Sequence, residues 1–153
     1  MSNQKQKYDR RQISDELKKE ILYVIRRPLP VEWEEQDVYF WMSRLAEAKR
    51  YVLLKIRVLE DQIYQIQQNI TVFENNTYKD VQNEGTGAVS ERRKISEARY
   101  KTDKKYISLL NDLRKVEAAM ADVQSDLENV TDKTFAVRKV ADFIKVHMMY
   151  EED

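Results

Sequence analysis

The sequence contains no cysteine and has only two glycines and two prolines among its 153 residues. Without cysteine, the chain has neither disulfide bridges nor thiolate metal sites. Glycine and proline interrupt helices, so their scarcity, together with 35 % charged residues, is typical of long helices or coiled coils. No apolar run approaches the roughly 18 residues that span a membrane, and the N-terminal residues lack the apolar core of a signal peptide. We therefore expect a soluble, intracellular, all-α protein of one domain, with no membrane partner.

The sequence also lacks the patterns that are typical of enzymes. Its single histidine, His147, stands among apolar residues in the last predicted helical turn, where an isolated histidine is more often a surface residue than a catalyst. The two glycines form the tripeptide GTG, which is not followed by the Lys-Ser/Thr of a phosphate-binding loop, so we interpret it as a turn. We therefore expect no catalytic residue, no metal site and no cofactor.

The first thirty residues predict a short helix that ends at a corner. Residues 1–12 are polar and expected to be flexible, and Ser14 is a candidate N-cap for a helix over 13–27. Pro28 and Pro30 end that helix, because proline lacks the backbone N–H and restricts the conformation of the preceding residue.

Apolar residues recur at heptad positions on both sides of the glycines. From 34 to 78, ten of twelve seam positions are apolar, and from 90 to 149 thirteen of sixteen are apolar. A pattern sustained over five or more heptads is typical of coiled-coil packing. We therefore expect a long antiparallel helical hairpin, with arms over 34–78 and 90–149 and a turn over 79–89, near Thr86.

The expected hairpin brings apolar layers of the two arms together, for example Ile63 with Leu109. The second arm is longer than the first, so we expect the short N-terminal helix to pack near the C-terminal end, beside residues 135–149. The stretch 129–134 (NVTDKT) is a candidate position for a kink in the second arm.

A basic cluster follows the glycines. Residues 91–105 carry seven basic side chains against three acidic ones, in a chain of net charge zero. Cations bind phosphates and exposed tyrosine rings stack on unpaired bases, which are the contacts of a single-stranded nucleic-acid binder. A solvated helix face is the alternative interpretation. The candidate nucleic-acid-binding residues, called the basic cluster below, are Arg92, Arg93, Lys94, Arg99, Tyr100, Lys101, Lys104 and Lys105.

Two apolar stretches, VYFWM at 38–42 and YVLL at 51–54, cover more helix faces than a two-stranded seam requires. A helix that is apolar all round is buried all round. The short N-terminal helix is one possible cover for VYFWM, whereas YVLL lies beyond its reach and predicts a second chain. We expect a homo-oligomer whose contacts include Tyr39, Phe40, Trp41, Tyr51, Leu53 and Leu54.

The expected layout is a short helix, a long helix, a glycine-containing break in a charged region and a second long helix with FAVRKV at 135–140. Over residues 13–145 it resembles the UvsY-type recombination mediators of tailed phages. The resemblance implies an oligomeric phage protein in the cytoplasm of a bacterial host. Such a mediator binds single-stranded DNA and helps to load the phage recombinase in place of the single-strand binding protein. No site residue is carried over, because basic residues before the turn are implicated in that family's DNA contact and QIYQIQQNITVFENN has none.

Two function classes therefore stay open. In the first, the chain is an oligomeric single-stranded DNA-binding protein of DNA recombination, and the basic cluster contacts phosphates. In the second, it is a non-enzymatic coiled-coil adaptor or assembly factor that binds another protein through VYFWM and YVLL.

Overall fold

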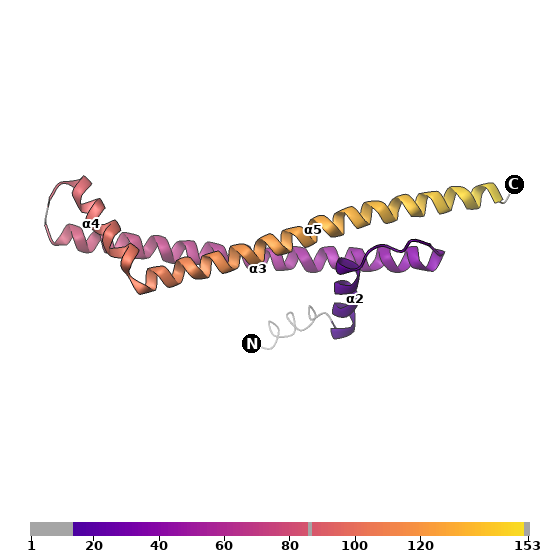
Figure 1. Ribbon diagram of the computed structural model, residues 1–153, viewed down its shortest axis with the longest axis horizontal. Helices are drawn as coiled ribbons and strands as arrows, with labels where there is room; N and C mark the ends of the chain where they lie inside the picture. The colour runs from indigo at the N-terminus through magenta and orange to yellow at the C-terminus, as the bar shows by residue number, and fades with distance from the viewer. Residues whose placement is uncertain (1–13, 86, 152–153) are drawn as a thin grey trace, which may run out of the picture. The chain divides into compact units, whose positions relative to one another are not determined.

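The computed structural model describes residues 14–85 and 87–151. Within these residues the chain forms four α-helices and no strand (Figure 1). The expected all-α fold is therefore confirmed. The segment 1–12 and Thr86, expected to be flexible and to form the turn, lie outside the described residues. The helices are α2 (Asp15–Arg26), α3 (Glu35–Asn83), α4 (Val89–Thr102) and α5 (Lys104–Glu151).

The chain divides into two compact units, and the single domain expected from the sequence stays a prediction. The terminal unit contains the residues up to Leu54 together with those from Gln124 onward, and the central unit contains Lys55–Val123. Both unit boundaries fall inside helices, α3 and α5, where the heptad pattern continues without a break. The sequence therefore carries no local signal for this division.

Helix α2 begins and ends at residues with clear local roles. The Leu17 N–H donates a hydrogen bond to the Ser14 side-chain oxygen (3.3 Å), which satisfies one of the free N–H groups of the first turn. At the other end, Arg27 takes an extended conformation (φ −86°, ψ 144°) directly before the first proline. Ile21, Val24 and Ile25 are buried, so this face of α2 packs in the terminal unit.

Trp41 lies at the centre of the aromatic residues of the terminal unit and is only 4 % exposed. Its ring lies 6.0 Å from that of Tyr23, and 6.4 Å from those of both Trp33 and Phe40. The chain's own rings therefore cover Trp41, which leaves little of its side chain for the predicted contact with a second chain. Other fully or almost fully buried residues of this unit are Leu45, Ala48, Val52, Val130 and Val137.

Two polar residues of α5 bind the C-terminal end of α2. The Lys133 ammonium group donates hydrogen bonds to the carbonyl oxygens of Val24 (2.9 Å), Ile25 (2.7 Å) and Arg27 (2.7 Å). The Asn129 amide donates to the same Ile25 oxygen (2.7 Å). The last carbonyls of a helix lack helical partners and carry partial negative charge, so a cation is favourable there. Burial lowers the pKa of Lys133.

The stretch 129–134, a candidate position for a kink, does not interrupt the second arm, because α5 is continuous through it. The hydroxyl groups of Thr131 and Thr134 donate to the carbonyl oxygens of Leu127 (2.8 Å) and Val130 (2.7 Å) one turn earlier. These hydrogen bonds hold the two threonine side chains against the backbone of α5, so neither residue interrupts the helix. The polar residues of NVTDKT that suggested a break are instead part of α5, and two of them, Asn129 and Lys133, bind the end of α2.

Replacing Lys133 by methionine should loosen α2. The change leaves the carbonyl groups of Val24, Ile25 and Arg27 without their charged donor, and such hydrogen bonds contribute about 1.5–3 kcal/mol each at most. We expect a loss of roughly 2–4 kcal/mol in the free energy of unfolding, read from urea denaturation. Hydrogen exchange should accelerate in α2. Lys49→Met, at an exposed lysine of α3 in the same unit, is the matched control. Unchanged exchange in α2 of Lys133→Met would contradict the assigned role.

The predicted register between α3 and α5 is wrong by one heptad in the central unit. The rings of Phe73 and Tyr106 lie 5.9 Å apart. In the predicted register, which pairs Ile63 with Leu109, the residue opposite Phe73 would be Arg99 and not Tyr106. A shift of one heptad brings the same kinds of seam position together, so the apolar pattern does not distinguish the two registers.

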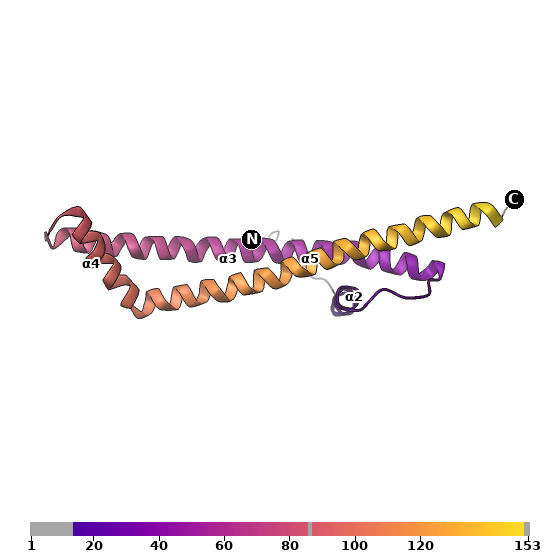
Figure 2. The ribbon, with the colours of Figure 1, turned by 45° about the horizontal axis from the view of Figure 1, so that its top comes forward.

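The second arm, predicted as one helix over 90–149, is interrupted at Asp103. Asp103 has an extended backbone (φ −74°, ψ 132°), and Figure 2 shows α4 turning away from α5 at this point. The Asp103 carboxylate accepts the Lys105 N–H (2.8 Å), so it caps the first turn of α5. From Tyr106 to Ile144 every predicted seam residue is buried or half-buried. The seam prediction fails within α4, where Ile95, Arg99 and Thr102 are exposed.

Candidate nucleic-acid interface

The two glycines allow the backbone to leave α3 and enter α4. Gly85 (φ +71°) and Gly87 (φ +81°) both take left-handed conformations, which side chains disfavour. A Cβ atom at Gly87 would lie 2.5 Å from the Glu91 side chain, so that side chain would also have to move. The basic cluster begins at Arg92, in the first turn of α4.

Three cations of the basic cluster already have partners in the chain. The Arg99 guanidinium donates two hydrogen bonds to the Glu84 carboxylate, at 2.6 and 2.5 Å, and this pair connects α4 to the residue after α3. Lys101 pairs with Glu97 one turn earlier on α4. The Arg92 Nε–H donates to the Gly87 carbonyl oxygen (3.0 Å). These cations order α4 and its entry, so they are less available to a ligand.

The other four cations, Arg93, Lys94, Lys104 and Lys105, are exposed. Within residues 14–85 and 87–151 none of them has an acidic partner among the ion pairs, which are Arg44–Glu20, Arg50–Glu47, Arg99–Glu84 and Lys101–Glu97. Two stand on α4 and two in the first turn of α5, on either side of the Asp103 break. These four, called the unpaired cations below, are the strongest candidates for phosphate contacts.

Tyr100 is half-buried, so the prediction that it is exposed is wrong. Its ring packs 4.9 Å from the ring of Tyr106, which is itself buried and donates its hydroxyl to Glu74 (2.8 Å). Burial, and then the Glu74 carboxylate, raise the pKa of Tyr106 to about 12. Tyr100 therefore belongs to an aromatic cluster with Tyr106 and Phe73, and only part of its ring is open to a ligand.

The Arg99 hydrogen bonds lower the pKa of Glu84 below its ordinary value of 4.5. Because the folded state depresses this pKa, the pair stabilises the fold above pH 4.5 and loses that effect as the pH falls through the lowered value. In a carboxyl-carbon NMR titration, the Glu84 midpoint should lie below 4.5, and Arg99→Gln should raise it. The control Arg114→Gln, at an exposed arginine of the same unit, should leave the midpoint unchanged. If the Glu84 midpoint is the same in Arg99→Gln as in the parent protein, the Arg99–Glu84 pair does not form in solution.

The predicted oligomerisation residues differ in exposure. Tyr39 (68 %), Leu53 (42 %) and Leu54 (45 %) are exposed apolar side chains of α3. Phe40 (37 %) packs edge-on against Trp41, and the Arg44 guanidinium lies 5.6 Å from the centre of its ring. Tyr51 is half-buried. Of the six predicted residues, Tyr39, Leu53 and Leu54 are therefore the best placed to meet a second chain.

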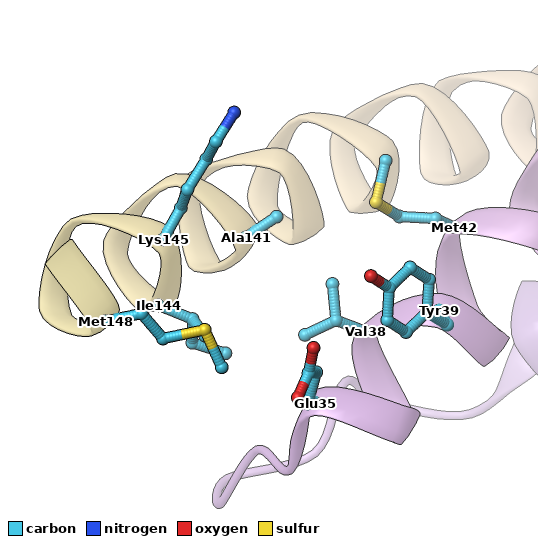
Figure 3. A pocket seen from close by; sticks show the side chains of 8 residues that line it. All are labelled: Glu35, Val38, Tyr39, Met42, Ala141, Ile144, Lys145 and Met148. Atoms are coloured by element: carbon cyan, nitrogen blue, oxygen red, sulfur yellow. The ribbon is translucent and has the colours of Figure 1, made fainter. Parts of the chain in front are cut away.

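A groove of about 310 Å³ lies in the terminal unit between the beginning of α3 and the end of α5. Figure 3 shows Val38 and Tyr39 of α3 facing Ile144 and Met148 of α5 across it, with the Lys145 side chain directed away. Sequence reasoning placed VYFWM on a contact surface but did not identify α5 as the other wall. Ala141, Ile144 and Met148 followed the heptad pattern, which gave no sign that the two helices leave a groove here.

The described part of the chain has no helix long and apolar enough to span a membrane. It also has no group of three or more His, Asp or Glu side chains that could hold a metal ion. No protein-family model, curated protein or solved structure matches the chain. The functional assignment therefore depends on the side chains described above.

Proposed function

We propose that this protein is an oligomeric single-stranded DNA-binding protein that acts as a recombination mediator and helps to load a recombinase. It acts without catalysis or cofactor, in the cytoplasm of a bacterial host. The observation that carries the proposal is the set of four unpaired cations on both sides of the Asp103 break. Phosphate contacts by lysine and arginine supply most of the affinity of sequence-independent DNA binding.

The unpaired cations and the paired ones have different roles in this proposal. Arg93 and Lys94 bind phosphates from α4, and Lys104 and Lys105 bind them from the first turn of α5. Basic residues in the first turn of a helix are unfavourable for the helix dipole unless an anion offsets them, so a phosphate is well matched there. The Arg99–Glu84 pair holds α4 in place and contributes less to binding directly.

The proposed assembly is a homo-oligomer of antiparallel helical hairpins. In the central unit, the end of α3 meets the beginning of α5 through Phe73 and Tyr106, and in the terminal unit the beginning of α3 lines a groove with the end of α5. Both sets of contacts support a hairpin. Exposed Leu53 and Leu54 support association, and several copies would present several basic clusters to one strand.

The salt dependence of binding tests this proposal. If each subunit neutralises about four phosphates, the slope of log K against log salt is about −3 per subunit. The affinity for a labelled oligo-dT strand should therefore fall roughly 50-fold between about 50 and 200 mM salt, in a fluorescence anisotropy titration. Absence of binding at low salt would overturn the DNA proposal.

The alternative function is a coiled-coil adaptor or assembly factor that binds another protein. The groove between α3 and α5 favours it, since its lining residues are mostly apolar and leave space that the described residues do not fill. An adaptor predicts no salt-dependent affinity for oligo-dT, so the same titration separates the two functions.

A further inference from the structure

A second cleft, of about 340 Å³, lies in the central unit between the end of α3 and α4. This volume falls within the roughly 300–1,000 Å³ of pockets that hold small molecules. The rings of Phe73 and Tyr100 line it, together with the polar side chains of Asn76, Asp80 and Asp103. Aromatic walls with a few polar groups are typical of sites that accept a flat, polar ring.

The polar groups of this cleft differ in whether they already form hydrogen bonds within the chain. Asp103 accepts a backbone N–H of α5 with one carboxylate oxygen, and Arg99, which also lines the cleft, is engaged with Glu84. Among the described residues, no hydrogen bond is formed by the side chains of Asn76 and Asp80. The Glu84 hydrogen bonds, and more weakly the charge of Asp80, raise the pKa of Arg99. The Asp80 carboxylate and the Asn76 amide nevertheless keep their hydrogen-bonding capacity for a ligand.

We propose that this cleft binds one unpaired guanine base of a single strand whose phosphates contact the unpaired cations; the inference rests on the proposed single-strand binding. The cleft and the cations are adjacent along the chain, since Asp103 lines the cleft and Lys104 follows it. A strand that contacts Lys104 thus passes beside the cleft.

Guanine fits these groups better than the other bases do. A carboxylate only accepts hydrogen bonds, and the Watson–Crick edge of guanine carries two adjacent donors, N1–H and the 2-amino group. Thymine has one donor between two carbonyl groups, which would face the carboxylate unfavourably. The Asn76 amide can donate to the guanine O6 while Asp80 accepts from the two donors. The aromatic walls contribute stacking that any base would share.

Fluorescence anisotropy with two labelled strands of equal length tests the inference. One strand is oligo-dT, and the other carries a guanine at about every fifth position. A bidentate contact discriminates between bases by about 1–3 kcal/mol, so the guanine strand should bind roughly tenfold more tightly. In Asp80→Asn this preference should disappear. The affinity of Asp80→Asn for oligo-dT should change by no more than the affinity of Asp112→Asn does. Asp112 is an exposed carboxylate of the same unit and the matched control for charge.

Equal binding of the two strands by the parent protein would overturn the guanine site and leave the proposed function intact. A preference that survives Asp80→Asn would also overturn it. If neither strand binds, the proposed function fails, and saturation-transfer NMR with guanosine and thymidine decides the cleft separately because nucleosides carry no phosphate. A guanosine signal that Asp80→Asn removes would support the site, and equal signals from both nucleosides would exclude it.

Discussion

Replacing Arg93 and Lys94 together by glutamate should lower the affinity for single-stranded DNA on the order of 100-fold at physiological salt. The change converts two of the four unpaired cations into repulsive charges, so the net charge of that set falls from four positive to zero. Both side chains are exposed and have no ion-pair partner within the described residues, so helical content and unfolding should change little. Anisotropy titration with oligo-dT measures the loss, and circular dichroism measures the helix.

The matched control for this change is Arg114→Glu with Lys115→Glu. These two residues are also consecutive, exposed and in the central unit, but they lie on α5 outside the basic cluster. The control carries the same change in net charge and should keep most of the affinity. An equal loss in both double variants would mean that overall charge, and not the basic cluster, governs binding. Unchanged affinity in Arg93→Glu/Lys94→Glu would leave the cluster as a solvated helix face and favour the adaptor.

Replacing Leu53 by glutamate should dissociate the oligomer and weaken binding to long strands by about 10²–10⁴-fold. Leu53 is 42 % exposed on α3, and an unpaired carboxylate in an apolar interface costs several kcal/mol. Later contacts of an oligomer with one strand are intramolecular, so their loss affects a strand of about 60 nucleotides far more than one of about 15. Light scattering measures the mass, and anisotropy with the two strands measures the avidity.

Val72→Glu is the control for this change. Val72 is a similarly exposed apolar residue of α3 (54 %), in the central unit and outside the predicted contact surface. It should leave both the mass and the strand-length dependence as they are in the parent protein. A monomer mass for the parent at micromolar concentration would defeat the oligomer proposal, and an intact oligomer in Leu53→Glu would move its interface elsewhere.

The sequence predicted which residues face inward better than it predicted where helices meet. Heptad spacing identified buried and half-buried residues such as Tyr106, Val130 and Val137 because burial follows the helical period. It did not fix the register of α3 against α5, because registers one heptad apart bury the same kinds of residue. The break at Asp103 was missed, since an aspartate in a charged segment is as common on a helix surface as at a cap.

The sequence located the charge of the candidate site but not its pairing. Arg99 and Glu84 are separated by the glycine turn, so their hydrogen bonds follow from the direction of α4, which no local pattern specifies. The role of Lys133 was hidden for the same reason, because its partners are the carbonyl groups of Val24, Ile25 and Arg27. Backbone carbonyls carry no sequence signature, so such a contact appears only when the helices are in place.

Helix α4 lies between two interruptions of the backbone, the positive-φ glycines and the extended Asp103, and the one buried residue within it is Ser96. An insertion or deletion in a helix of the seam would shift every later apolar residue to another face. A substitution at an exposed position of α4, by contrast, leaves the pairing of Phe73 with Tyr106 as it is. In evolution, this segment is therefore where the protein can gain or lose charged residues, and so adjust its ligand, without altering the coiled-coil core.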